Sequence, residues 1–101
     1  MPALKRPAKV RVLGKPYVIQ WVDKVGDGLN GLTDCDGLEI SVLDSLKLET
    51  EQDILLHEVL HAVEAQMGLD LEDTIIERLA TGLLAVLKDN PTLITYLRRK
   101  K

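Results

Sequence analysis

The sequence has only one cysteine, Cys35, so an internal disulfide bond is excluded. Disulfides persist in oxidising compartments, and small secreted domains often depend on several of them. A single cysteine therefore favours a cytoplasmic location. The opening residues MPALKRPAKV lack the apolar core of a signal peptide, and no run approaches the ~20 apolar residues of a membrane span. We expect no membrane-spanning segment.

An excess of basic residues is also missing. The chain has 16 acidic and 13 basic residues, which gives a formal net charge of -3. A dedicated nucleic-acid-binding protein needs a broad cationic face, and this balance does not supply one. Basic residues are dense only over 5–11 and in a basic tail over 98–101. We interpret both groups as solubilising termini and do not expect a nucleic-acid partner.

A chain of 101 residues can bury one compact core, so we expect a single domain over residues 1–101. Prolines at positions 2 and 7 indicate an irregular leader over residues 1–8. Apolar residues then alternate over 10–12 and 17–21, on either side of the turn-forming LGKP, which predicts a β-hairpin.

The segment GDGLNGLTDCDG at 26–37 is dense in glycine, aspartate and asparagine, which predicts a loop with room for one short strand. The segment lacks the spacing and terminal glutamate of an EF-hand, so turn formation explains its acids better than calcium binding does. The alternation that follows predicts a third strand over 38–42, with one buried face.

Helical signals begin near Thr50, which heads a segment similar to a capping box. We expect a helix from Glu51 to Met67 that ends at Gly68, and a second helix capped by Asp70. Asn90-Pro91 then ends that helix and starts a short final one. The predicted fold is α+β: a small, mostly antiparallel sheet of about three strands, followed by two main helices and a short C-terminal helix.

The stretch LLHEVLHAVEAQ at 55–66 contains both histidines of the chain. On a helix, His57 and His61 differ by only about 40° in direction and about 6 Å in rise, so both imidazoles can reach one metal ion. Zinc suits two nitrogen ligands and one carboxylate, with a fourth position left for water. Glu58 points about 100° around the helix and can lie beside that water as a general base.

A chance pair of solvent-facing histidines is the simpler interpretation of this motif. The helix, however, has an apolar stripe of Leu56, Leu60, Val63 and Met67, and this stripe places both histidines at its margin. Such a margin can border a cleft, so we favour a metal site.

The third ligand has several candidates. Glu64 lies too far along the helix axis to reach an ion that His57 and His61 share. It is either a partner that contacts a ligand from outside the metal's ligand set or a surface charge. Helix capping already explains the acidic residues of the next helix start, Asp70, Glu72 and Asp73. Glu77 lies a turn inside that helix, and antiparallel packing would bring it toward the histidines. The alternative for Glu77 is a solvated flank.

The segment His57-Glu58-Val59-Leu60-His61 resembles the HExxH signature of zincin metallopeptidases, and Glu77-Arg78-Leu79-Ala80 is similar to the second-helix pattern of gluzincins. The order of elements over residues 10–90 resembles compact ImmA/IrrE-type metallopeptidase domains of phages and mobile elements. The resemblance implies a Zn²⁺-dependent peptidase that acts on a peptide or protein substrate. It further implies His57, His61 and Glu77 as ligands and Glu58 as the base.

The other catalytic features have more than one candidate each. No further histidine is present to stabilise an oxyanion, so Tyr17, Tyr96 or an arginine would have to do so. The edge of the strand at 38–42 could hold an extended substrate. Two rival interpretations are a non-catalytic zinc-binding interaction module, with Cys35 as a conceivable fourth ligand, and a metal-free adaptor whose helices bind another protein.

Overall fold

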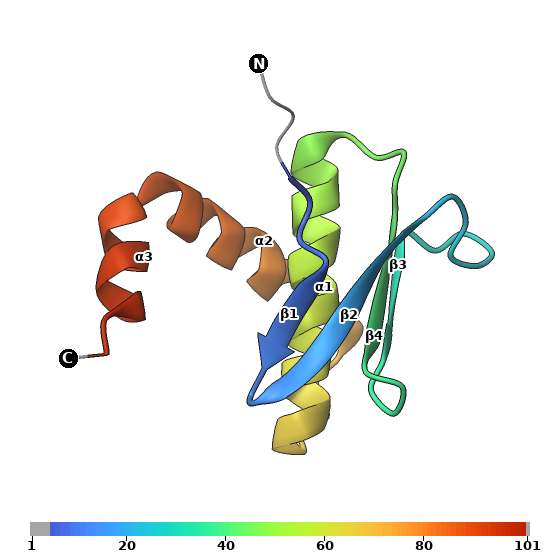
Figure 1. The fold of residues 1–101 in the computed structure, drawn as a ribbon, viewed down its shortest axis with the longest axis horizontal. Coiled ribbons are helices and arrows are strands. Elements are labelled where there is room, and N and C mark those ends of the chain that lie inside the picture. Colours follow the sequence, from blue (N-terminus) through green and yellow to red (C-terminus); the bar gives the residue numbers. More distant parts are fainter. Residues whose placement is uncertain (1–4, 101) are drawn as a thin grey trace.

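The computed structural model describes residues 5–100, so part of the predicted leader and the last residue of the basic tail lie outside the described residues. The α+β prediction is confirmed, because a sheet precedes three helices in the chain (Figure 1). The strands are β1 (Lys9–Val12), β2 (Lys15–Val22), β3 (Gly31–Asp34) and β4 (Glu39–Leu43). The helices are α1 (Leu48–Met67), α2 (Asp73–Asp89) and α3 (Pro91–Arg98).

The sheet has four strands in the order β1-β2-β4-β3, one more than the approximate number predicted. It is mixed, but two of its three pairings are antiparallel, so the prediction of a small, mostly antiparallel sheet is confirmed. β1 pairs with β2 and β3 with β4 in antiparallel fashion, whereas β2 and β4 are parallel. The extra strand, β3, forms inside the glycine-rich segment. β4 takes the interior position because Ile40 and Val42 are fully buried, and the partly exposed β3 is left at the edge.

Helix α1 lies across one face of the sheet and closes the hydrophobic core (Figure 1). Ala62 of α1 is fully buried there. The helix starts at Leu48 with Lys47 as an N-cap that makes no side-chain hydrogen bond, so the capping-box prediction at Thr50 is wrong. Gly68 ends the helix as predicted, with the φ of 68° that glycine tolerates best. The core cluster consists of Val12, Tyr17, Ile40, Val42 and Ala62.

The irregular residues before β1 are tied to the domain through Arg6. Its guanidinium Nη2 lies 2.6 Å from Glu51 Oε1 and donates to the carbonyl of Asp44 at 2.9 Å. The same group lies 4.8 Å from the ring centroid of Trp21, a cation–π contact. Arg6 is therefore a structural cation and not merely a solubilising one.

Helix α2 begins at Asp73 with Glu72 as its N-cap, so the prediction of Asp70 as the cap is wrong. The chain between the helices turns back along α1, because the Leu71 N–H donates to Glu64 Oε2 at 2.6 Å. α2 then passes beside α1, where the Thr81 hydroxyl donates to Asp53 Oδ1 at 3.1 Å. Among the described residues, no helix combines the length and apolar character needed to pass through a bilayer.

Candidate metal centre

The two histidines of α1 point toward one another from successive turns. Nε2 of His57 and Nε2 of His61 lie 3.0 Å apart, and both side chains are partly buried. This is the geometry that a four-residue spacing gives on a helix, because each turn returns the side chain to nearly the same direction.

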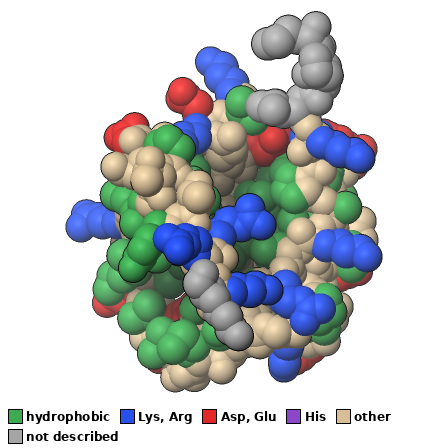
Figure 2. Space-filling view, turned by 60° about the vertical axis from the view of Figure 1, so that its left-hand side comes forward, with side chains coloured by type: hydrophobic (Ala, Val, Ile, Leu, Met, Phe, Trp, Pro, Cys, Tyr) green, Lys and Arg blue, Asp and Glu red, His purple; other side chains and the backbone are tan. Residues whose placement is uncertain are grey.

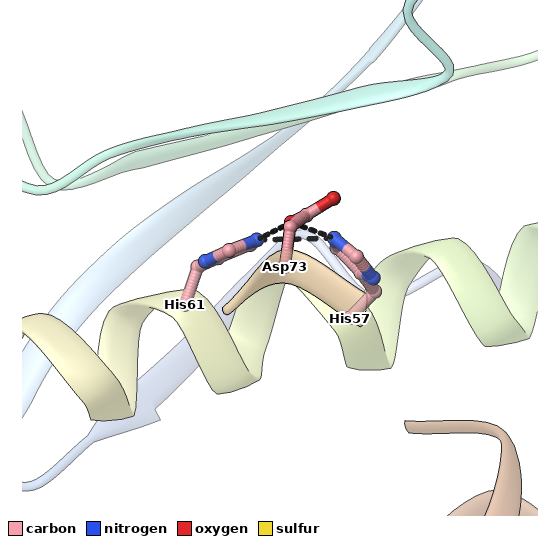
Figure 3. A group of neighbouring side chains, drawn as sticks. All are labelled: His57, His61 and Asp73. Carbon is pink, nitrogen blue, oxygen red and sulfur yellow. Dashed lines mark hydrogen bonds and ion pairs between the residues drawn. The ribbon is translucent and has the colours of Figure 1, made fainter. Parts of the chain in front are cut away.

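Asp73, the first residue of α2, completes a group of three (Figure 3). Its Oδ1 lies 3.0 Å from His61 Nε2 and 3.5 Å from His57 Nε2. A tetrahedral zinc ion with bonds of about 2.0–2.1 Å holds its ligand atoms about 3.3 Å apart. The three edges of this triangle, 3.0, 3.0 and 3.5 Å, match that spacing, so the residues fit zinc.

Glu58 lies beside the histidines, but its carboxylate is hydrogen-bonded to the sheet and not to them. Its buried carboxylate accepts a hydrogen bond at Oε1 from the Thr33 hydroxyl of β3, at 2.8 Å. Its second oxygen, Oε2, lies 4.0 Å from His57 Nε2. Glu58 is therefore adjacent to the group of His57, His61 and Asp73, which we call the metal group, without belonging to it. A base for a metal-bound water requires this arrangement.

Gly31 allows β3 to lie this close to α1. A Cβ at Gly31 would come within 2.7 Å of Ile54 Cγ2 and 3.0 Å of Glu58 Cγ. A side chain at this position would displace Ile54, Glu58 or the strand itself, and so would disturb the packing that holds the Thr33 hydroxyl against the Glu58 carboxylate.

Glu64 contacts both α1 and the segment before α2. Its Oε1 lies 3.1 Å from His61 Nδ1, and its Oε2 accepts the Leu71 N–H. The Leu71 N–H, followed by the His61 side chain, holds the pKa of Glu64 below its ordinary value. Of the two roles considered for Glu64, the structure shows the histidine partner. A carboxylate on the far ring nitrogen fixes the orientation and tautomer of a ligating imidazole.

Glu77 lies one turn beyond Asp73 and is exposed on the same cleft. No hydrogen bond or ion pair between described residues joins its carboxylate to a histidine, and its role as a ligand stays a prediction. The structure brings Asp73 to the histidines instead, a residue that sequence reasoning assigned to helix capping. The only local signal was an acidic residue in the first turn of the next helix, which capping explains equally well.

The metal group opens into a cleft of about 730 Å³ between α1, the start of α2 and β3 with its preceding loop. Tyr17 and Tyr96 do not line this cleft. Tyr17 is buried in the core, where burial raises its pKa above the ordinary value of 10.0, and Tyr96 is exposed on α3. The residues that line the cleft include no arginine, whereas Asn30, Thr33 and Cys35 line it.

The arrangement offers three converging ligand atoms, a neighbouring carboxylate outside the group and an open cleft in front of them. Cys35 is not part of the group that the described residues form. Comparison of the chain with protein-family models, with curated proteins and with solved structures finds no match.

Proposed function

We propose that the protein is a zinc-dependent peptidase. The observation that carries this proposal is the convergence of His57, His61 and Asp73 at zinc-like spacing, with the Glu58 carboxylate beside them. Two imidazoles and one carboxylate form the ligand set of catalytic zinc sites, which keep one coordination position open. The resemblance of the HEVLH segment to zincins supports the same function.

The chemistry divides between the metal and the chain. Bound zinc would lower the pKa of its water toward ~7 and polarise the scissile carbonyl. Glu58 Oε2 would serve as the general base that accepts a proton from the attacking water and as the acid that returns it to the leaving amine. Thr33 engages the other carboxylate oxygen and leaves Oε2 on the side of His57.

The free edge of β3 is the proposed substrate-binding strand. β3 is an edge of the sheet and pairs only with β4 among the described strands, and its residues Gly31, Leu32 and Thr33 line the cleft. An extended peptide can pair with such an edge through main-chain hydrogen bonds. The predicted edge at 38–42 is not free, because it corresponds to the interior strand β4.

The substrate is therefore a peptide or an unfolded protein segment. Leu29 and Leu32 line the cleft with 46% and 49% of their surface exposed, and they offer apolar contacts to its side chains. We also propose a cytoplasmic location, since the single Cys35 suits a reducing compartment. An origin in a phage or mobile element rests on the family resemblance.

The second candidate is a non-catalytic zinc-binding module that recognises another protein. Closed structural zinc sites use four protein ligands. The group of potential ligands found among residues 5–100 contains three, which favours the open, catalytic arrangement. In the metal-free adaptor, the same contacts would be hydrogen bonds and ion pairs among His57, His61 and Asp73.

The test uses zinc-loaded wild-type protein and a set of unstructured peptides whose cleavage is followed by mass spectrometry. Glu58→Gln keeps the shape of the side chain and removes the base, so we expect at least about a hundredfold loss of rate with zinc content unchanged. Glu49→Gln, at an acidic position in the first turn of α1, is the matched control and should cleave normally. Cleavage by Glu58→Gln at the wild-type rate would exclude this base, and a zinc-loaded wild type that cleaves no peptide would favour the module.

A further inference from the structure

Helix α2 has a second apolar face, turned away from the metal centre. Four of its large hydrophobic residues are 42–46% exposed: Ile75, Leu79, Leu83 and Val86. We refer to them as the α2 outer face. On a helix that turns 100° per residue, they point about 200–280° away from Asp73, whereas Glu77 points only about 40° away. The outer face can therefore be covered without closing the cleft.

The spacing along this face is that of a helix-pairing seam. Ile75, Leu79, Gly82 and Val86 are separated by four, three and four residues, the alternation found in coiled coils. Gly82 lies at the middle of the seam, and a Cβ added there would meet no atom within 4 Å. Nothing in the described chain explains a glycine in this helix interior, a position that normally disfavours it. A second helix that crosses α2 at Gly82 would explain this glycine, because glycine permits close backbone approach.

Helix α3 buries none of its residues, and its apolar side chains point to different sides: Ile94 lines the hollow on the α1 side of α2 with Leu84 and Leu87. Figure 2, which brings forward the side of the molecule with α2 and α3, shows hydrophobic side chains at the surface on either side of a hollow. The exposed α3 residues, Leu93, Ile94, Tyr96 and Leu97, are 37–66% exposed.

The charges beside the seam suit a second copy of the same helix. Arg78 and Asp89 point to the same side of α2, near opposite ends of the seam, and neither forms an ion pair within residues 5–100. When two α2 helices pack antiparallel around Gly82, each Arg78 comes within about one turn of the other copy's Asp89. A two-fold interface needs this kind of self-complementary surface.

We propose that the chain forms a two-fold symmetric dimer in which the α2 outer faces of two copies pack antiparallel across Gly82. This dimer does not depend on zinc, and it leaves both clefts open because Asp73 and Glu77 lie on the opposite side of α2.

Sedimentation of the full chain over about 1 to 200 µM tests the dimer, whose mass should approach twice 11.2 kDa. Leu79→Glu places two charges in the seam and should weaken association at least about a hundredfold. Leu48→Glu is the matched control, because Leu48 is 50% exposed and lies at the start of α1 rather than on α2. This variant should dimerise normally. A wild type that stays monomeric throughout, or a dimer that Leu79→Glu leaves intact, overturns the proposal.

Cross-linking tests the antiparallel geometry. In a Cys35→Ser background, Gly82→Cys should give a disulfide-linked dimer, because the two copies of position 82 meet at the axis. Lys88→Cys, also exposed on α2 but outside the seam, should remain unlinked. Circular dichroism of each variant confirms folding. Linkage at position 88 and none at position 82 would overturn the proposed pairing.

Discussion

The Thr33 hydroxyl of edge strand β3 donates a hydrogen bond to Glu58 Oε1 at 2.8 Å and lies 2.9 Å from the main-chain carbonyl oxygen of the same residue. A strand residue therefore holds the carboxylate that we propose as the base and contacts the helix backbone beside it. The other oxygen of Glu58 is left facing His57. The proposed substrate strand and the proposed base are thus coupled through one side chain.

Thr33→Val keeps the shape of the side chain and removes the hydroxyl. Without it the Glu58 carboxylate can adopt orientations that point away from the cleft, so we expect kcat to fall about tenfold while KM and zinc affinity stay within about twofold. Steady-state kinetics and a zinc-chelator competition measure the two effects. Thr33→Ser restores the hydroxyl and should recover most of kcat. A Thr33→Val variant with unchanged kcat would show that β3 does not position the proposed base.

The third ligand is decided by comparing two carboxylates on successive turns of α2. Asp73→Asn should weaken zinc binding at least about tenfold, because Asp73 is the acid that contacts both histidines. Glu77→Gln should change zinc affinity less than about threefold. Competition with a chromogenic chelator gives both constants. The reverse order of effects would establish Glu77 as the ligand and would show that the start of α2 moves when metal binds.

Glu64 should affect metal binding without touching the metal. Glu64→Ala removes the partner of His61 Nδ1 and the acceptor of the Leu71 N–H, so we expect zinc affinity to fall about 10–100-fold. Glu72→Ala, which removes an exposed carboxylate from the same segment, is the control. Hydrogen exchange of metal-free protein provides a second measurement, in which the Leu71 amide should exchange faster only in Glu64→Ala. Equal behaviour of the two variants would reduce Glu64 to a surface charge.

Stability at alkaline pH should depend on Tyr17. Burial raises its pKa in the folded state above the ordinary value of 10.0, so the unfolded chain releases the proton first. The contribution of Tyr17 is complete below that ordinary value and is lost as pH rises through the folded pKa. Urea unfolding at about pH 8 and about pH 11 should show a smaller loss of stability in Tyr17→Phe than in the wild type. Tyr96→Phe, at a 66% exposed site, should behave as the wild type does.

The features that local physics determines were predictable from the sequence. The two histidines of α1 converge because a four-residue spacing on a helix allows little else. Gly68 ends that helix because glycine readily adopts a positive φ. The alternating residues around Ile40 form a strand, as expected of a segment with one buried face.

The features that depend on long-range packing were not predictable. The composition of residues 26–37 left room for a short strand, but the position of β3 depends on its pairing with β4 and on the close approach to α1 that Gly31 permits. Asp73 reaches the histidines because Glu64 draws Leu71 back along α1 and so sets where α2 begins. Neither contact leaves a periodic pattern in the sequence, and an acid at the start of a helix looks the same whether it caps the helix or binds a metal.

The most direct measurement is the metal content and X-ray absorption spectrum of protein purified without a histidine tag. We predict about one zinc ion per chain, with nitrogen and oxygen ligands at about 2.0–2.1 Å and no sulfur ligand from Cys35. Mutation of His57 or His61 to alanine should abolish tight binding. Less than about a tenth of an equivalent of zinc in the wild type, under conditions where added zinc is not retained either, would contradict a metal centre at these residues.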